Sequence, residues 1–459
     1  MVKLGLESQR KNVDKKTLDG YIAKLQPMID CKTVFKRDGS NDTEFQKFND
    51  VIANNFPLVH KLCEKLVFGS GCFIYKYEGV QSRHNIMLMS HHDVVEATDG
   101  WHSDAFHSQI KNGSLYGRGT IDTKTPLFAQ LQAMEELLNE GYDFKGLTVY
   151  IGSSNNEEVC GDGMVKASDY FKANHIHFDV ISDEGGAITS GMIPGFKGKS
   201  AMVAVHEKSR HMYLCKTRLL AKGHGGLSLN DDSAIIRLMG FINEINNTRI
   251  YHNTFYPEVK ATFNDHAPYM SFPMNIVFSH LNVFSPIVKK IMSNIPPAKA
   301  MLSTSITFTT INAGNPLDPQ IKAKEAECTM FIRCIREDDL EKGMNQIKSV
   351  AAKYGVEITL LERDYCQPSR FDSNAFNILK KVMNENFPDV VVAPFLLTAG
   401  TDARRFSDVC DNILRFAPID LDSEQFNSIH GDDEHIKLVN IGQCVCFYKD
   451  FIVELGRKL

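Results

Sequence analysis

Short apolar segments alternate with amphipathic ones along the first part of this chain, and this alternation constrains the fold more than any other feature of the sequence. Residues 125–141, TPLFAQLQAMEELLNEG, carry apolar side chains at helical spacing, with Thr125 expected at the N-cap. Residues 43–68 are also expected to form an amphipathic helix. Three segments have the character of strands: CFIYKYE (72–78), NIMLMS (85–90) and LTVYIGSS (147–154). Strands that alternate with helices predict an α/β fold with a mixed, mostly parallel sheet sandwiched by helices.

The pattern changes near residue 209 and returns near residue 363. The middle part contains SITFTTINAG, ECTMFIRCI and an amphipathic segment, DDLEKGMNQIKSVAAKYG, which together predict a smaller α+β unit. A chain of 459 residues is also too long for one ordinary core. We therefore expect one α/β domain formed by residues 1–208 and 363–459, interrupted by a second domain formed by residues 209–362.

Composition excludes several classes of partner. Net charge is −5 and no long Lys/Arg run occurs, so no nucleic-acid partner is expected. No apolar segment reaches the length of about 18 residues that a membrane-spanning helix needs, so no membrane partner is expected. The N-terminal residues lack an apolar signal region, and the eleven cysteines include no CxxC pair. The prediction is a cytoplasmic protein with reduced thiols.

Histidine or acidic side chains follow three of the predicted strands, at the point where each strand ends. Because the carboxyl ends of parallel strands meet at one edge of a sheet, side chains far apart in sequence should converge there. The predicted strand at residues 148–152 is followed, after a small polar turn, SSNN, by the pair Glu157-Glu158. A further predicted strand, at residues 179–182, leads directly into the pair Asp183-Glu184. The residues at these ends are His91, Asp93, Glu157, Glu158, Asp183 and Glu184.

Two loops add further candidate ligands. Asp122 lies in LYGRGTIDTK, just before the helix expected at Thr125, and His430 lies in SIHGDDEHI, before the closing helix. Each stretch has an ordinary explanation when it is considered alone. An HxD sequence is common in solvated loops, adjacent glutamates are common on helix surfaces, and acidic residues such as Asp432 are favourable near a helix N-terminus.

Considered together, these residues have the composition of a dinuclear metal site. Two histidines and three carboxylates, with Asp122 shared, would hold two divalent cations, and a bridging hydroxide would make the site neutral. Mixed histidine and carboxylate ligation fits zinc best, with cobalt or manganese as alternatives. One glutamate of the pair Glu157-Glu158 can bind metal while its neighbour stays free, and a free carboxylate beside an activated water is what a general base requires.

A set of motifs resembles a known family. In family order, the chain contains SHHDVVEATDGWHSDAF, LYGRGTIDTK, SSNNEEVCGDG, ISDEGGAI, LAKGHGGLS, FIRCIREDD, LTAGTDARRF and IHGDDEHI, which span most of its length. These stretches resemble the dinuclear zinc amidohydrolases that include aminoacylase, carboxypeptidase S, glutamate carboxypeptidase and the cytosolic dipeptidases. The resemblance implies a dizinc exopeptidase-like fold, in which the inserted domain serves as a lid and supports a homodimer.

The resemblance also implies metal ligands at specific positions. His91 and one acid of the pair Asp183-Glu184 would bind one metal, with Asp183 favoured and Glu184 left open. The other implied ligands are Glu158 and His430 for the second metal and Asp122 as the bridge. A cis peptide bond between Asp122 and Thr123 is implied as well.

The remaining roles concern the reaction itself. Glu157 would act as general base and acid, Asp93 would orient the site, and His224 would reach the substrate carbonyl. Arg333 and Arg404 would meet a substrate carboxylate. The expected reaction is hydrolysis of an amide next to a free carboxylate, in N-acyl amino acids, dipeptides or C-terminal residues of short peptides.

Two alternatives remain open. A dizinc aminopeptidase would recognise a free amine, although Arg333 argues mildly against it. A non-catalytic homologue that binds peptides would be marked by a missing ligand, and none is missing. Glu96 and Ala105 stand where the family usually has proline, which bears on substrate preference rather than on metal binding.

Overall fold

The structure is a computed structural model that describes residues 10–219, 233–294, 296–317 and 320–459. The chain divides into two compact units, each formed from several segments. The first unit comprises Met1–His206, Lys260–His280 and Gln367–Leu459, and the second comprises Glu207–Val259 and Leu281–Cys366.

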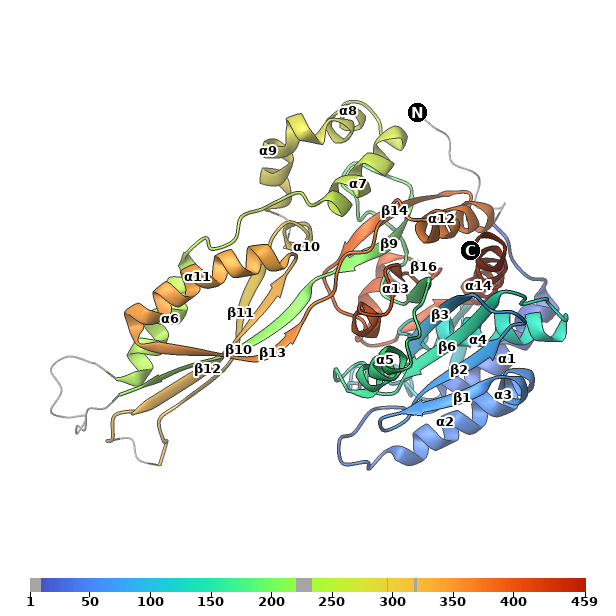
Figure 1. The fold of residues 1–459 in the computed structure, drawn as a ribbon, viewed down its shortest axis with the longest axis horizontal. Coiled ribbons are helices and arrows are strands. Elements are labelled where there is room, and N and C mark those ends of the chain that lie inside the picture. The colour runs from blue at the N-terminus through green and yellow to red at the C-terminus, as the bar shows by residue number, and fades with distance from the viewer. Residues whose placement is uncertain (1–9, 220–232, 295, 318–319) are drawn as a thin grey trace. The chain divides into compact units, whose positions relative to one another are not determined.

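A large mixed sheet forms the centre of the first unit, in the order β1-β2-β6-β3-β7-β15-β9-β8-β16, with β14 beside β9 (Figure 1). Its middle strands β6, β3, β7 and β15 run parallel, while β2 and β9 join them antiparallel, so the expected parallel arrangement applies to the centre of the sheet. The strands are β1 (Glu64–Phe68), β2 (Cys72–Glu78), β3 (His84–His91), β6 (Leu147–Ser154), β7 (Val180–Asp183), β8 (Ile188–Ser190), β9 (Lys199–Glu207), β14 (Val390–Leu397), β15 (Ile413–Arg415) and β16 (Asp420–Leu421).

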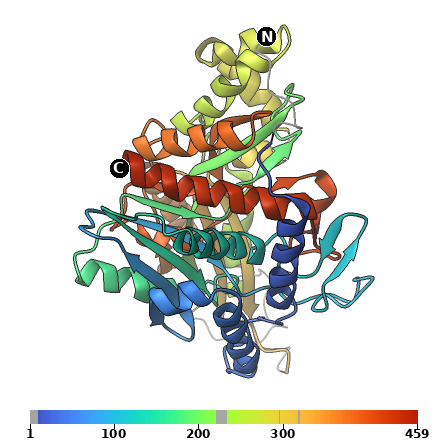
Figure 2. The same cartoon turned by 90° about the vertical axis from the view of Figure 1, so that its right-hand side faces the viewer.

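Helices cover both faces of this sheet, as the sequence predicted. Alternate side chains of β3 point to opposite faces, so Ile86 and Leu88 lie in one core while Met87 and Met89 lie in another. The first core also contains side chains of α1, α4, α12 and α14, and the second contains side chains of α5 and η4. Figure 2 shows α14 beside α1. The helices and 3-10 turns of this unit are α1 (Lys15–Ile29), α2 (Asp42–Asn55), α3 (Pro57–Leu62), α4 (Lys124–Asn139), α5 (Gly163–Ala173), α7 (Pro257–His266), η3 (Ala267–Tyr269), α8 (Met274–Ser279), α12 (Asn374–Asn386), η4 (Asp402–Phe406), α13 (Ser423–Ser428) and α14 (Leu438–Lys458).

Two local expectations are wrong. Residues 43–68 do not form one helix, because Pro57 starts a separate short helix and the last five residues form β1, which pairs antiparallel with β2. The helix expected to be capped by Thr125 begins earlier, at Lys124, with Thr123 at the N-cap.

A small three-stranded sheet, β17-β5-β4, joins two segments that are distant in sequence. It consists of β4 (Gln109–Lys111), β5 (Ser114–Tyr116) and β17 (His435–Lys437). The pairing of Tyr116 with His435 holds the loop that follows β5 beside the loop that precedes β17. These loops carry Asp122 and His430.

The second unit is an α+β structure with its own core. Its antiparallel sheet has the order β11-β12-β10-β13, and α6 and α11 pack on it. Gly355 ends α11 in the left-handed conformation, with φ of 62°, which glycine adopts without steric cost. Its elements are β10 (Ser209–Arg218), α6 (Ala234–Asn247), α9 (Leu281–Met292), α10 (Pro296–Ala300), β11 (Ser305–Ala313), β12 (Glu325–Cys334), α11 (Glu337–Tyr354) and β13 (Val356–Asp364).

The division differs from the sequence-based boundaries by a few residues at both ends of the insertion and by one whole segment within it. Residues 209–362 were expected to form a single insertion, but Lys260–His280 belongs to the first unit. Contacts within that unit explain this placement: the Thr262 hydroxyl donates to the Pro394 carbonyl at 2.5 Å, and His266 Nε2 lies 2.8 Å from the Ser200 hydroxyl.

None of the described helices is both long and apolar enough to cross a lipid bilayer.

Candidate metal centre

The ends of three parallel strands bring the predicted residues to one edge of the large sheet. His91, the last residue of β3, is in register with Ser154, the last residue of β6. Asp183 is the last residue of β7, which pairs with β3 on its other side. Strand register therefore places His91 between the segment that leads to Glu157 and the end of β7.

Asp122 lies between two histidines. Its Oδ1 atom lies 2.9 Å from His91 Nε2, and its Oδ2 atom lies 3.1 Å from His430 Nε2. Glu158 Oε2 is 3.1 Å from the same His430 nitrogen. Single ligand atoms of His91, Asp122 and Glu158 all lie within 4.8 Å of one another. Each oxygen of Asp122 thus faces a different histidine, as a bridging carboxylate between two metals requires.

The charges in this cluster favour cations. Burial alone would lower the pKa of His91, but Asp122, Asp93 and Glu158 raise it well above its ordinary value. Asp122 and Glu158 likewise raise the pKa of His430 to about 10. Carboxylates that hold positive charge this strongly, together with imidazole nitrogens, form a donor set that fits two divalent metal ions.

The main chain of Asp93 orients the first histidine. His91 Nδ1 donates to the Asp93 carbonyl at 2.9 Å, which directs Nε2 toward Asp122. The buried Asp93 carboxylate accepts from the backbone N–H groups of Glu157 at 3.1 Å and Glu158 at 3.0 Å. Asp93 therefore connects the end of β3 to the glutamate pair. Its neighbour His92 belongs to the core instead, because its ring stacks on Phe48 at 4.9 Å.

The Glu157 carboxylate is free beside the cluster. Within the described part of the chain it forms no hydrogen bond or ion pair. Burial, followed by Asp402 and Asp93, raises its pKa well above the ordinary value, although His91 acts in the opposite direction. A carboxylate that accepts a proton readily is suited to general acid–base chemistry.

The pair at the end of β7 is arranged unequally. Asp183 Oδ1 accepts from the Glu184 N–H at 3.0 Å, and Oδ2 accepts from the Ala403 N–H at 2.9 Å. Glu184 is also buried, but its Oε2 atom has no hydrogen-bond partner among the described residues. Both side chains line a small cavity together with His91 and Glu157.

Sequence reasoning missed a further acid at this cavity, Asp402. It begins η4 and lines the cavity with Glu157 and Asp183. Burial, then the Asp183 charge, raises its pKa to about 6. Within the motif LTAGTDARRF, the sequence predicted a role for Arg404 alone. The acid in the same motif was the signal that could have identified Asp402.

Sequence reasoning also missed a buried ion pair that holds the two loops together. Arg118 Nη1 donates to Glu434 Oε2 at 2.8 Å, and both side chains are almost fully buried, with relative exposures of 1% and 0%. Glu434 also accepts from the N–H groups of Ile121 at 2.7 Å and Asp122 at 3.1 Å. Arg118 Nη2 donates to the Gly431 carbonyl at 2.7 Å. The pair therefore connects the backbone of Asp122 to the residue that follows His430.

Of the remaining predicted residues, Arg333 and Arg404 belong to different units. His224 falls outside the described residues. Arg333 lies on β12 in the second unit, where its guanidinium covers the Phe331 ring at 5.4 Å. Arg404 lies in η4 of the first unit and is buried. The peptide bond between Asp122 and Thr123 is cis, which confirms the expectation from the resemblance.

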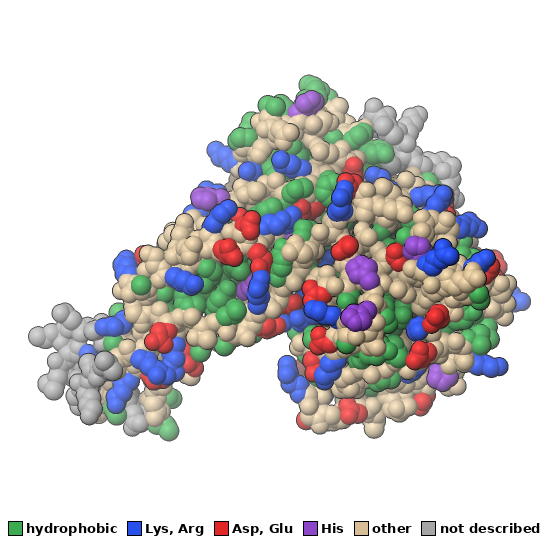
Figure 3. Space-filling model, viewed as in Figure 1, with side chains coloured by type: hydrophobic (Ala, Val, Ile, Leu, Met, Phe, Trp, Pro, Cys, Tyr) green, Lys and Arg blue, Asp and Glu red, His purple; other side chains and the backbone are tan. Residues whose placement is uncertain are grey.

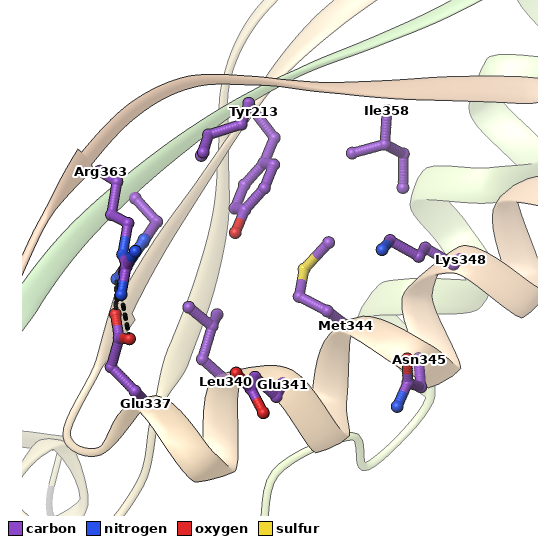
Figure 4. A pocket seen from close by; sticks show the side chains of 11 residues that line it. Tyr213, Glu337, Leu340, Glu341, Met344, Asn345, Lys348, Ile358 and Arg363 are labelled. Carbon is purple, nitrogen blue, oxygen red and sulfur yellow. Dashed lines mark hydrogen bonds and ion pairs between the residues drawn. The ribbon is translucent and has the colours of Figure 1, made fainter.

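A separate pocket of the second unit contains none of these residues. It lies between α11 and the strands β10 and β13 and has a volume of about 500 Å³. Figure 4 shows Glu337 paired with Arg363 at one end and Met344 near Tyr213 in the middle. Because its charged pair is already satisfied within the unit, the pocket is a less suitable metal site than the cluster around Asp122.

Comparison with known proteins identifies the family. Residues 87–454 match peptidase family M20/M25/M40. The chain belongs to this peptidase family. It is therefore an enzyme of the metallopeptidase type, and hydrolysis of an amide bond is its class of reaction.

Individual M20 relatives are similar over nearly the whole chain. A probable carboxypeptidase S-like 2 of Dictyostelium discoideum is 29% identical, covering 91% of this chain and 81% of that protein. The N-fatty-acyl-amino acid synthase/hydrolase PM20D1 of Mus musculus is also 29% identical, covering 93% of this chain and 86% of that protein. A metallo-carboxypeptidase of the M20 family, Sso-CP2 from Sulfolobus solfataricus, has the same fold, with a TM-score of 0.66, 15% identity and coverage of 97% and 100%.

Proposed function

We propose that the chain hydrolyses the amide bond of a substrate that has a free carboxylate beside that bond. One observation carries this proposal: His91 and His430 meet opposite oxygens of Asp122, and Glu157 lies at the same cavity as His91 with a carboxylate that no described residue pairs with. The names of the relatives support a substrate of the N-acyl amino acid or peptide C-terminus type.

Two metal ions, most suitably zinc, would occupy the cluster. His430 and Glu158 would hold one, and Asp122 would contact both. For the ion beside His91 we favour Glu184 over Asp183, which sequence reasoning had preferred. Both Asp183 oxygens already accept backbone N–H groups, whereas Glu184 keeps a buried oxygen without a partner among the described residues. When bound, the metals activate water and polarise the substrate carbonyl.

The side chains supply the proton transfers. Glu157 takes a proton from the attacking water and then delivers it to the leaving amine, so it serves first as base and then as acid. Asp93 maintains the position of Glu157 through the backbone hydrogen bond described above. His224 would donate to the developing oxyanion, and Arg333 and Arg404 are candidates to bind the substrate carboxylate.

Replacement of the base tests the proposal directly. Glu157→Gln keeps the size of the side chain but removes its basicity, so metal content should persist while turnover falls by about 100-fold or more. Metal content is measured on the purified protein, and turnover is measured with zinc, cobalt or manganese added. Glu341→Gln makes the same chemical change at an exposed position of α11 and should leave turnover unchanged. Unaltered turnover in Glu157→Gln would remove the proposed base.

A substrate panel separates the alternatives. N-acyl amino acids and dipeptides should be cleaved, while N-acyl amino acid amides, which lack the carboxylate, should react poorly. Preference for free-amine substrates without a carboxylate would instead indicate an aminopeptidase. A protein that contains metal and binds peptides without turning any of them over would indicate a non-catalytic homologue.

A further inference from the structure

One helix of the second unit exposes a stripe of apolar side chains. Along α9, Val283, Ile287 and Ile291 recur at intervals of four residues and therefore lie along one side of the helix. Their relative exposures are 72%, 61% and 54%. On the opposite side of the helix, Leu281, Val288 and Met292 are buried. The stripe therefore lies on the exposed side of α9.

The sequence around this stripe carries only positive charge. Between Asp265 and Asp318 the chain contains three lysines and no aspartate, glutamate or arginine. This is unusual in a chain with 23% charged residues. Lys290 lies three residues after Ile287, so it occupies the same exposed side of α9. In Figure 3, green hydrophobic and blue Lys or Arg side chains are visible over the region that Figure 1 labels α9.

A basic groove borders the stripe. It has a volume of about 1010 Å³, and its lining includes Arg249, His252, Lys290 and Lys299. No Asp or Glu occurs among the described residues that line it. No described carboxylate forms an ion pair with Arg249, Lys290 or Lys299. The groove therefore presents several cations that the described structure does not neutralise.

We propose that α9 and this groove bind the surface of an anionic lipid layer. The apolar stripe would enter the boundary between headgroups and acyl chains, and the groove cations would meet the headgroup anions. An amphipathic helix with apolar residues on one side and lysines beside them has the composition of such an interfacial element. This contact requires no spanning helix, and it differs from the sequence-based expectation that no membrane partner exists.

Charge argues against a second copy of this chain as the occupant. A two-fold interface places the same patch against itself, so the lysines and Arg249 of both copies would face one another without neutralising carboxylates. A soluble anion could satisfy the groove, but it would leave Val283, Ile287 and Ile291 in water. A lipid surface would both bury the apolar stripe and neutralise the cations of the groove.

Vesicle sedimentation with the full chain tests the proposal. The wild-type protein should bind vesicles of phosphatidylcholine mixed with phosphatidylserine, bind pure phosphatidylcholine weakly, and lose affinity as salt increases. The double variant Lys290→Gln/Lys299→Gln should bind the anionic vesicles about 30-fold less tightly. The double variant Val283→Ser/Ile287→Ser should bind them at least tenfold less tightly, because it removes apolar surface that would be buried in the lipid layer.

Matched controls lie in the same unit. Lys348→Gln on α11 and Leu361→Ser on β13 change exposed side chains of the same types and should leave vesicle binding unchanged. All variants should keep wild-type thermal unfolding and amide hydrolysis, which separates lipid binding from the proposed reaction.

Three results would overturn the proposal. The first is equal binding to neutral and anionic vesicles, or no binding to either. The second is loss of vesicle binding in millimolar inorganic phosphate at constant ionic strength, which would indicate a soluble-anion site. The third is a change of oligomeric state in Val283→Ser/Ile287→Ser without a change in vesicle affinity, which would indicate contact between copies.

Discussion

Among the described residues, Glu434 forms no hydrogen bond or ion pair with the side chain of a candidate metal ligand, yet it holds the backbone of Asp122. Its carboxylate accepts N–H groups from Gly119, Ile121 and Asp122 and pairs with Arg118. Glu434→Gln should destabilise the protein by about 3–5 kcal/mol, because it leaves the buried Arg118 charge without its neutralising carboxylate. It should also weaken metal binding by about 10- to 100-fold, because partners that orient a ligand influence metal affinity at this scale.

Urea unfolding of the metal-free protein and metal titration measure these two effects separately. Asp408→Asn provides the control, since it removes the same charge from an exposed pair with Lys172. It should change neither quantity noticeably. Wild-type metal affinity in Glu434→Gln would show that the loop around Asp122 is held by other contacts.

The sequence predicted the identity of the candidate metal-binding residues better than any other part of the site. His91, Asp122, Glu158 and His430 were predicted, and their side chains form one cluster. The partners of Glu434 could not be inferred, because three of its bonds are to backbone N–H groups that carry no sequence signature. The choice between Asp183 and Glu184 also depended on which backbone groups lay nearby.

At the scale of elements, α7 contains a buried histidine that should make stability depend on pH. His266 Nδ1 donates to the Thr262 carbonyl at 2.6 Å, and Nε2 accepts from the Ser200 hydroxyl at 2.8 Å. Burial lowers the pKa of His266, and the Lys380 charge lowers it further, although the bond to Thr262 opposes this. The folded protein therefore binds this proton less readily than the unfolded chain, whose histidine pKa is about 6.5.

The stability from neutral His266 is complete above the unfolded pKa and is lost as pH falls below about 6.5. Urea unfolding of the metal-loaded protein at several pH values measures the slope. His266→Gln should reduce the slope over this window, whereas His107→Gln, at an exposed position, should retain it. A slope unchanged by His266→Gln would assign the acid sensitivity to other groups.

Elements with a clear pattern of apolar residues were predicted correctly. Elements whose structure depends on pairing with another segment were not. The central strands β3 and β6 carry runs of apolar residues and are buried along most of their length, because helices cover both faces of the sheet. In contrast, Glu64–Phe68 continues an amphipathic pattern from the preceding helices and becomes a strand only because β2 offers it an edge.

At the scale of the whole molecule, metal binding should stabilise the first unit. Its candidate ligands come from segments as distant as His91 and His430, so bound ions would restrain a large part of this unit. Removal of metal with a chelator should lower the unfolding temperature, and added zinc should restore it. The expected stabilisation is about 4 kcal/mol when free metal exceeds the dissociation constant by about 1,000-fold.

Differential scanning calorimetry with and without chelator measures this shift. Asp122→Ala should unfold at the same temperature in both conditions, since it removes the candidate bridging ligand. A chelator effect of wild-type size in Asp122→Ala would place the stabilising metal elsewhere in the protein.

The sequence by itself determined the alternation of strands and helices, the chemical types of the candidate metal ligands and the family. These properties depend on local periodicity and on short motifs, which neighbouring residues encode. Only the tertiary structure decided which acid at the end of β7 keeps a free oxygen, that Arg118 and Glu434 fasten two loops, and that α9 exposes an apolar side. Those outcomes depend on contacts between segments distant in sequence, and no local pattern specifies which backbone group or side chain will be near.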